Sequence, residues 1–378
     1  MKLFDVYPLF PIEPVKAEGS WLWDSEGKKY LDLYGGHAVI SIGHNHAHFV
    51  EALKSQLDKI SFYSNSVKNS LQERLAEKLG QISSYPNHQL FLCNSGAEAN
   101  ENALKLASFV NGRKKVIAFK NAFHGRTSGA VAATDNPKIV SPFNSGHDIL
   151  FLPLNDEATF INTIDNKVSS VIIEGIQGVG GIHVPQRSFL QLLKRKCKEV
   201  GALLIVDEIQ SGYGRTGKFF AHQHAEVEAD LITIAKGMGN GFPIGGVLIH
   251  PDIKPWNGML GTTFGGNYLA CAAALAVLEV IESENLMHNA SKLGNYLMEQ
   301  LKSFPSIQEV RGVGLMIGFD LPASLASLRK EILVKHHIFT GEAKPNTIRL
   351  LPSLALSKKE SDLFLGALDL ELKRAVGS

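Results

Sequence analysis

A lysine and an aspartate stand at the ends of two short apolar segments of this chain. Asp207 follows the run Ala-Leu-Leu-Ile-Val at 202–206, and Lys236 follows the run Leu-Ile-Thr-Ile-Ala at 231–235. If both runs are buried strands of a parallel sheet, the two charges lie at the edge where such sheets bind ligands. This pair suits pyridoxal phosphate (PLP), because the amine can form a Schiff base with the cofactor aldehyde and the carboxylate can hold the pyridine nitrogen protonated. The alternative is a structural ion pair between strand ends.

The segments around these residues alternate between strand and helix patterns. Short Val/Ile/Leu runs at 171–173, 202–206, 231–234 and 247–249 are separated by longer amphipathic stretches, one of which repeats Leu190, Leu193 and Cys197 at helical spacing. This alternation predicts an α/β fold with helices covering a mainly parallel sheet. After about Gly266 the pattern changes to an Ala/Leu-rich helical stretch at 268–284, a second helical stretch, and strand candidates near Gly312 and Ile348.

A second informative segment is Asn94-Ser-Gly-Ala-Glu98. Ser95 and Glu98 have the spacing of a helix capping box, and a helix is expected from there through Val110. Free amides at a helix N-terminus bind phosphate, and Gly96 lets the backbone approach a ligand closely. Taken alone, the segment would be interpreted as an ordinary helix start.

Several segments, in the same order and over nearly the whole chain, resemble the class III aminotransferases, which are PLP enzymes of fold type I. The matching segments are 30–33, 94–100, 123–127, 207–217, 235–237, 262–267, 311–318 and 348–352. Within the class, the likeness is to the acetylornithine and succinylornithine aminotransferases. The resemblance implies a large domain at 50–260 with a mainly parallel seven-stranded sheet. It also implies a smaller α+β domain assembled from 1–49 and 261–378.

The resemblance assigns residues to the cofactor. Lys236 would be the catalytic amine, Asp207 would hold the ring nitrogen and Gln210 would contact the ring hydroxyl. Phe123 would stack on the ring, although without the family match it would be taken for a core aromatic. The phosphate would bind to the remaining set: the side chain of Ser95, the amides of Gly96 and Ala97, and Thr263 from the neighbouring subunit of a homodimer.

The same resemblance implies transamination of N-acetyl- or N-succinyl-L-ornithine with 2-oxoglutarate, giving the N-acylglutamate semialdehyde and glutamate in arginine metabolism. Arg126 would hold the α-carboxylate of the acylornithine, and Arg349 that of glutamate, because a guanidinium grips carboxylates bidentately. Glu174 is expected near Asp207 or near a substrate-binding arginine. His37 either touches the substrate or lines the cleft. Ornithine or 4-aminobutyrate aminotransferase is the alternative, because these families share every cofactor residue.

The sequence departs from the family at three positions. Many relatives have Glu-Pro-x-Gln-Gly-Glu, whose last glutamate pairs with the arginine matching Arg349, whereas this chain has Glu-Gly-Ile-Gln-Gly-Val at 174–179. In those relatives the glutamate side chain pairs with the arginine and switches away when the substrate glutamate binds, and Val179 cannot act in this way. We hypothesise that the loss of this acid makes the pocket more positive and more tolerant of an anionic acyl group such as succinyl. Gly175 replaces the proline, and His37 stands where ornithine-specific relatives have a tyrosine.

Composition argues against other classes of function. The net charge is +1 and there is no basic block, so no nucleic-acid partner is expected. The three cysteines are scattered, which argues against a disulfide framework or a zinc site and fits a reducing cytosol. The N-terminal segment is broken by Asp5, Pro8 and Pro11, and no apolar run approaches the ~20 residues of a membrane span. We therefore expect a cytoplasmic protein with small-molecule substrates.

Two segments contain patterns that imitate other sites. The loop 212–217 satisfies G-x-G-x-x-G, but five residues separate it from the strand end. With Lys218 the loop also resembles a Walker A loop, but Phe219 stands where a Ser or Thr is needed. His44, His46 and His48 have an alternate spacing that could suit a metal, but in the family this segment is a turn, and we expect no metal.

Overall fold

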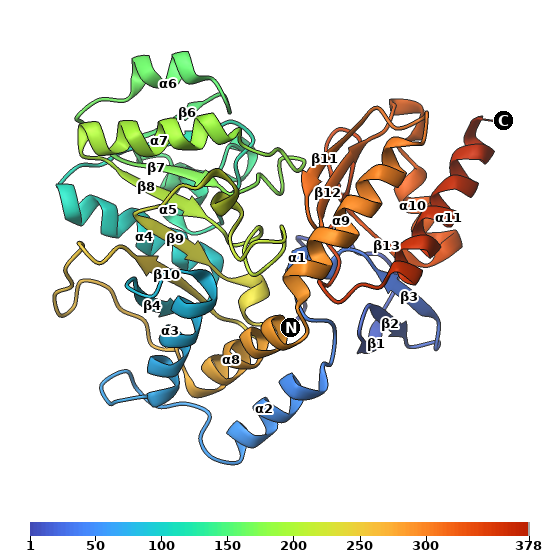
Figure 1. The fold of residues 1–378 in the computed structure, drawn as a ribbon, viewed down its shortest axis with the longest axis horizontal. Coiled ribbons are helices and arrows are strands. Elements are labelled where there is room, and N and C mark those ends of the chain that lie inside the picture. Colours follow the sequence, from blue (N-terminus) through green and yellow to red (C-terminus); the bar gives the residue numbers. More distant parts are fainter. Residues whose placement is uncertain (377–378) are drawn as a thin grey trace.

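The computed structural model describes residues 1–376 and contains one large β-sheet and two smaller ones. The large sheet has seven strands in the order β4-β10-β9-β8-β7-β5-β6 (Figure 1). Only β10 runs against its neighbours, pairing antiparallel with both β4 and β9. The predicted α/β fold with a mainly parallel seven-stranded sheet is therefore confirmed. The strands are β4 (Gln89–Cys93), β5 (Lys115–Phe119), β6 (Ile149–Leu152), β7 (Val168–Glu174), β8 (Leu203–Asp207), β9 (Leu231–Ile234) and β10 (Gly245–Ile249).

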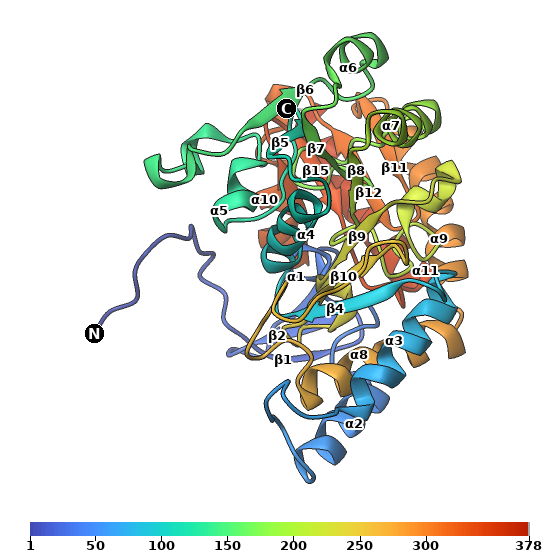
Figure 2. The ribbon, with the colours of Figure 1, turned by 90° about the vertical axis from the view of Figure 1, so that its left-hand side faces the viewer.

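Helices cover both faces of this sheet (Figure 2). Helix α4 (Gly96–Asn111) packs on β7, β8, β9 and β10, and α7 (Arg187–Val200) packs on β7 and β8 from the other side. Leu190, Leu193 and Cys197 of α7 are all buried, which confirms the amphipathic helix predicted from their spacing. Because β7, β8 and β9 are covered on both faces, they consist almost entirely of buried residues.

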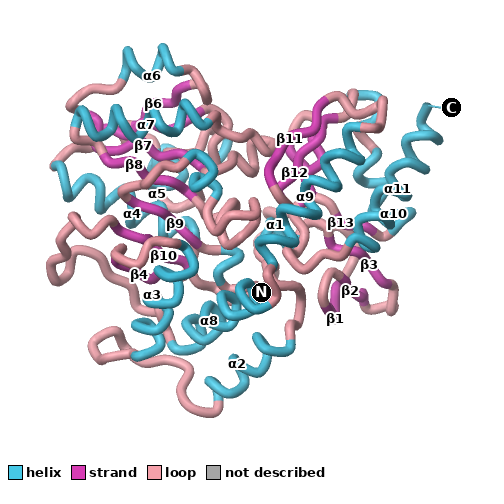
Figure 3. Tube along the Cα trace, in the orientation of Figure 1, coloured by secondary structure: helices cyan, strands magenta, loops and turns pink. Residues whose placement is uncertain are grey.

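The two smaller sheets lie together on one side of the large sheet, among the C-terminal helices (Figures 1 and 3). One contains β1 (Pro14–Glu18), β2 (Trp21–Asp24), β3 (Lys29–Asp32) and β13 (Ile338–Phe339). The other contains β11 (Glu309–Val313), β12 (Met316–Asp320), β15 (Thr347–Leu350) and β14 (Gly341–Ala343). Because β13 pairs in parallel with β3, the two ends of the chain share one sheet.

Helix α8 (Tyr268–Ser283) confirms the Ala/Leu-rich helix predicted at 268–284 and is buried along most of its length. It packs against α2 (Ala47–Leu57) and α3 (Ser70–Ser83). The predicted domain boundaries at 50 and 260 stay a prediction. The remaining helices are α1 (Gly35–Ala38), α5 (Ser128–Ala132), α6 (Glu157–Thr163), α9 (Leu286–Lys302), α10 (Leu328–His336) and α11 (Lys358–Val376). In residues 1–376, no helix has the length and apolar character that crossing a bilayer requires.

Candidate active site

A cavity of about 380 Å³ lies at the carboxyl ends of β8 and β9. Asp207 is the last residue of β8, and Lys236 follows β9 after Ala235. Most of the predicted site residues line this cavity, whereas Thr263, Arg349 and His37 are outside its lining. The predicted residues in the lining are Ser95, Gly96, Ala97, Phe123, Arg126, Glu174, Asp207, Gln210 and Lys236.

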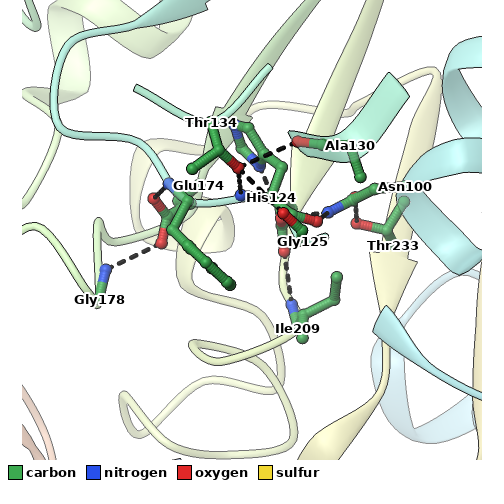
Figure 4. Close-up of polar contacts among 11 residues, drawn as sticks. Asn100, His124, Gly125, Ala130, Thr134, Glu174, Gly178, Ile209 and Thr233 are labelled. Atoms are coloured by element: carbon green, nitrogen blue, oxygen red, sulfur yellow. Dashed lines mark hydrogen bonds and ion pairs between the residues drawn. The ribbon is translucent and has the colours of Figure 1, made fainter. Parts of the chain in front are cut away.

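Asp207 is buried, and three residues hold its carboxylate. These residues, Asn100, His124 and Ile209, are labelled in Figure 4. Its Oδ2 accepts a hydrogen bond from Asn100 Nδ2 at 2.7 Å and lies 2.8 Å from Nδ1 of His124, while Oδ1 accepts from the amide of Ile209 at 3.0 Å. Within the described chain Asp207 forms no ion pair with Lys236, so the alternative of a strand-end ion pair does not describe this site. The carboxylate is fixed by groups other than the lysine that shares its cavity.

His124 and Asn100 are functional candidates that the sequence reasoning missed. Both lie in segments that carry the family resemblance, but no spacing pattern connects them with Asp207. Thr233 donates from Oγ1 to Asn100 Oδ1 at 2.7 Å, which orients the Asn100 amide toward the carboxylate. The Nε2 atom of His124 is buried and has no hydrogen-bond partner within the described residues. Such an atom needs an additional ligand or water to be satisfied.

Lys236 adopts a left-handed backbone conformation, with φ of +46°, at the start of a short 3₁₀ turn. Burial lowers the pKa of its amine, while the carboxylates of Asp207 and Glu174 act in the opposite direction. A lowered pKa increases the fraction of neutral amine, which is the form that attacks carbonyl groups and accepts protons.

Glu174 ends β7 and lies beside Asp207 in the strand register. Its Oε1 accepts from the amide of Phe123 at 3.0 Å, and its Oε2 accepts from the amide of Gly178 at 2.9 Å. Burial, with a further contribution from Asp207, raises the pKa of Glu174 to about 7. Glu174 therefore lies beside Asp207, and Gly178, whose amide it accepts from, also accepts from Arg349 through its carbonyl.

The start of α4 borders the cavity. Ser95 accepts from the amide of Glu98 at 3.2 Å, and the Glu98 carboxylate accepts from the amide of Asn94 at 3.0 Å. This confirms the predicted cap, with Glu98 reaching the residue before Ser95. A Cβ on Gly96 would lie 2.8 Å from Ile209 Cγ2, so glycine allows the segment after β8 to pack against the helix start.

Arg126 is exposed and has no hydrogen-bond or ion-pair partner within the described residues, although it lines the cavity. Arg349 is buried and donates from Nη1 to the carbonyl of Gly178 at 3.0 Å and from Nε to that of Glu342 at 2.9 Å. His37 is exposed, and its carbonyl accepts from Gln210 Nε2 at 3.1 Å. Neither Arg349 nor His37 lines the cavity. Arg349 contacts Gly178, which precedes the lining residue Val179, and His37 contacts the lining residue Gln210.

The loop 212–217 and the three histidines at 44, 46 and 48, which imitate nucleotide and metal sites in the sequence, make contacts within the fold. In the loop 212–217, the buried side chain of Arg215 donates to the carbonyls of Leu315 and Pro352, which joins the loop to the C-terminal part of the chain. The three histidines contact three different carboxylates. The pairs are His44 with Asp32, His46 with Glu284 and His48 with Glu279.

The residues around the cavity fit PLP on structural grounds. A helix start offers amides to a phosphate, a buried carboxylate is placed for a ring nitrogen, and a lysine faces the same space. Gln210 Oε1 and His124 Nε2 are buried polar atoms without partners in the described chain, so polar capacity remains for a ligand.

Comparisons with known proteins agree with this chemistry. The family model described as "Aminotransferase class-III" matches residues 5–372. The chain is 42% identical over 350 residues to the acetylornithine aminotransferase of Archaeoglobus fulgidus, covering 92% of each chain. It is 41% identical over 365 residues to that of Bacillus subtilis, covering 95% of this chain and 94% of the relative. The crystal structure of ornithine aminotransferase from Toxoplasma gondii superposes with a TM-score of 0.90 at 27% identity, covering 97% of this chain and 92% of that one. The chain therefore belongs to the class III aminotransferases and has the fold type I of PLP-dependent enzymes, and membership of this family implies that its cofactor is PLP.

Proposed function

We propose that this aminotransferase moves the distal amino group of an N-acylornithine to 2-oxoglutarate, giving the N-acylglutamate semialdehyde and glutamate. The observation that carries this proposal is the similarity, over more than nine tenths of both chains, to relatives named acetylornithine aminotransferase. The geometry agrees with it, because one cavity contains the lysine, the buried aspartate and a free arginine. This reaction would place the enzyme in arginine metabolism.

The chain's own groups suggest how PLP would be held. Ser95 and the amides of Gly96 and Ala97 would bind the phosphate, while Phe123 would lie against the ring. Asp207, oriented by Asn100 and His124, would hold the ring nitrogen, and the unpartnered Oε1 of Gln210 is available to the ring hydroxyl. Bound PLP supplies an aldehyde that captures amines and a ring that accepts electrons.

Lys236 would act as the proton carrier. Its lowered pKa favours a neutral amine, which can take a proton from the substrate carbon and return it at the neighbouring position. Asp207 accepts hydrogen bonds from Asn100 and from the amide of Ile209, which would leave it oriented to hold the ring nitrogen.

The two arginines would divide the carboxylates between them. Arg126 is free to grip the α-carboxylate of the acylornithine, and Arg349 would hold the α-carboxylate of glutamate or 2-oxoglutarate. When glutamate occupies Arg349, Arg126 would hold its side-chain carboxylate.

A homodimer would complete the phosphate site with Thr263. This residue is exposed next to Phe264, which is 60% exposed and packs with Phe62 at 5.3 Å between ring centroids. An apolar pair beside Thr263 supports a second copy covering this surface.

Transamination of free ornithine, or of another ω-amine, is the alternative. The structural similarity to an ornithine aminotransferase favours it, but the identity is 27% compared with 42% for the acetylornithine relative.

A half-reaction assay tests the proposal. PLP-loaded protein is mixed separately with N-acetylornithine, N-succinylornithine and free ornithine, and the visible absorption band of the bound cofactor is followed. Rapid loss of the band with an acylated donor supports the proposal and names the donor. Reaction with ornithine alone, or with none of the three, contradicts it. Lys236→Ala serves as the inactive control.

A further inference from the structure

The side chain of Arg126 depends on its backbone for its position. It lines the cavity but has no hydrogen-bond or ion-pair partner within the described residues. The segment 123–130 carries this arginine from Phe123, which also lines the cavity, to the start of the short helix α5. The contacts that hold this segment therefore decide where the guanidinium can reach.

Glu101 of α4 holds the part of the segment that follows Arg126. Its Oε2 accepts from Thr127 Oγ1 at 2.6 Å and from the amide of Ala130 at 3.0 Å, and the amide of Gly129 lies 2.9 Å from both carboxylate oxygens. The first amides of a helix have no partner within the helix, and a carboxylate is favoured beside them. In the described chain, the hydrogen bonds of the Glu101 carboxylate all go to residues 127–130.

Asn100, the neighbour of Glu101 on α4, holds the part of the segment that precedes Arg126. Its Nδ2 donates to the carbonyl of His124 at 2.7 Å and to Asp207 at the same distance. Arg126 thus lies between two anchors that come from consecutive positions of one helix. The Asn100 anchor also serves the carboxylate expected at the ring nitrogen, whereas within residues 1–376 the Glu101 carboxylate bonds to none of the residues assigned to the cofactor.

Gly125 lets this segment pack closely on the start of α4. Its φ is +137°, and a Cβ at this position would lie 2.8 Å from the Cβ of Ala97. Ala97 is one of the residues expected to bind the phosphate. The same helix therefore begins at the expected phosphate site and, one turn later, anchors the segment of the arginine.

We propose that Glu101 is a positioning residue for Arg126, which fixes residues 127–130 so that the guanidinium meets the α-carboxylate of the amino donor. Glu101 itself does not touch the substrate. Recognition of the donor carboxylate then depends on Glu101, whereas the affinity for PLP does not. This inference rests on the proposed function, which assigns the α-carboxylate of the donor to Arg126.

The test compares two donors that differ only in the α-carboxylate, N-acetylornithine and N-acetylputrescine. Half-reaction rates of the holoenzyme at low donor concentration give a ratio that reports recognition of this carboxylate. In Glu101→Gln, an amide NH₂ replaces one acceptor oxygen, and we expect the ratio to fall about tenfold through a higher KM for N-acetylornithine. This is within the roughly hundredfold that a displacement of ~1 Å can cost. The kcat with N-acetylornithine and the Kd of PLP should change less than about twofold.

Asp156→Asn is the matched control. Asp156 caps α6 in the same manner, accepting from Thr159 Oγ1 at 2.6 Å and from the Thr159 amide at 3.0 Å, and it lies outside the cavity lining. Its substitution should leave the donor ratio unchanged. Because Glu101 acts through Arg126, Glu101→Gln should also have no further effect on the ratio in an Arg126→Ala background.

The other outcomes overturn the inference. They are an unchanged ratio, equal losses with both donors, a weakened affinity for PLP, and a further loss of the ratio in the Arg126→Ala background. If Glu101→Gln does not fold, Thr127→Val, which removes the hydroxyl donor at similar side-chain volume, must show the same selective loss.

The wild-type enzyme separates this result from the proposed function. Reaction with ornithine but not with N-acetylornithine would contradict the proposed function, and the pair ornithine and putrescine would then test Glu101 by the same ratio. A wild type that does not distinguish donors with and without the α-carboxylate, or that reacts with none of these donors, leaves Arg126 without this role and overturns the inference.

Discussion

The Nδ1 atom of His124 lies 2.8 Å from Oδ2 of Asp207, and both side chains are almost completely buried. Asn100, which lies on α4, donates to the same oxygen, and a hydrogen bond from Thr233 fixes the orientation of the Asn100 amide. The position of the carboxylate is therefore set by a network that includes residues from α4, the loop after β5, β8 and β9. The first prediction concerns this network.

Substitution of His124 by Ala should weaken cofactor binding and slow transamination. Removing a hydrogen bond to a buried charged group costs about 1.5–3 kcal/mol, which corresponds to roughly 10- to 100-fold in the dissociation constant of PLP or in kcat. Fluorescence titration of the apoprotein with PLP, together with steady-state kinetics, measures both. His48→Ala removes an exposed histidine paired with Glu279 and should change neither quantity. Equal behaviour of the two variants would exclude a role for His124 at the site.

Restoring an acid at position 179 should reduce activity toward an anionic donor. Val179 is 41% exposed and lines the cavity, so Val179→Glu places a negative charge near Arg349. We expect the ratio of kcat/KM for N-succinylornithine to that for N-acetylornithine to fall about fivefold, the size of a close unfavourable charge interaction of ~1 kcal/mol. Val184→Glu introduces the same charge at an exposed position outside the cavity lining and should leave the ratio unchanged. A ratio unaffected by Val179→Glu would refute the link between the missing acid and the acyl group.

The stability of the apoprotein should fall as the pH rises from about 5 to 8 because of Glu174. Its pKa is raised from 4.5 to about 7, so in this range the folded state holds a proton that the unfolded state releases. Stability contributed by the protonated form is lost as the pH passes the folded pKa, by roughly 2–3 kcal/mol over this interval.

Urea unfolding at several pH values measures this loss. In Glu174→Gln the slope should be smaller by about that amount, while a cost independent of pH remains because the amide NH₂ faces one of the two backbone donors. Glu299→Gln, at an exposed position of α9, should keep the wild-type slope. If the free energy of unfolding changed with pH in the same way in the wild type and in Glu174→Gln, Glu174 would not titrate in this range.

Gly96→Ala should impair cofactor binding more than folding. The added Cβ would lie 2.8 Å from Ile209, so either the helix start or the segment after Asp207 must shift. Overpacking of this kind costs about 1–3 kcal/mol, and we expect the dissociation constant of PLP to rise by about tenfold or more. Gly366→Ala adds a Cβ that meets nothing within 4 Å on α11 and serves as the control. Wild-type affinity in Gly96→Ala would show that the helix start does not contact the cofactor.

The fold was predictable where the local pattern and the tertiary environment agree. Runs of Val, Ile and Leu identified β7, β8 and β9 because both faces of these strands are buried. The same pattern could not give the direction of β10, which is as apolar as its parallel neighbours but runs against them. Direction depends on how the connecting segments pack, and a five-residue run carries no information about it.

The site was predictable in its residues but not in its contacts. Lys236 and Asp207 could be recognised because each ends an apolar run, and the helix cap at Ser95 has a fixed spacing. By contrast, His124 contacts Asp207 across 83 positions of the sequence, a separation that no local pattern spans. The contact between Arg349 and the ring of Tyr34 spans a still longer part of the chain. Arg349 was expected to hold a substrate carboxylate, and His37 either to touch the substrate or to line the cleft. Both lie outside the lining of the cavity, and their roles stay predictions.

The sheet shared by the two ends of the chain has a consequence for synthesis. Until β13 leaves the ribosome, β3 has no partner on one side, and Arg349 follows β13 in the chain. A nascent chain can therefore build most of the large sheet while Arg349, the proposed carboxylate-binding residue, is still missing and one strand edge is open. Open edges promote pairing between chains, and contacts between distant segments form slowly. Expression of this enzyme should consequently be sensitive to premature termination and to protection of the nascent N-terminal strands.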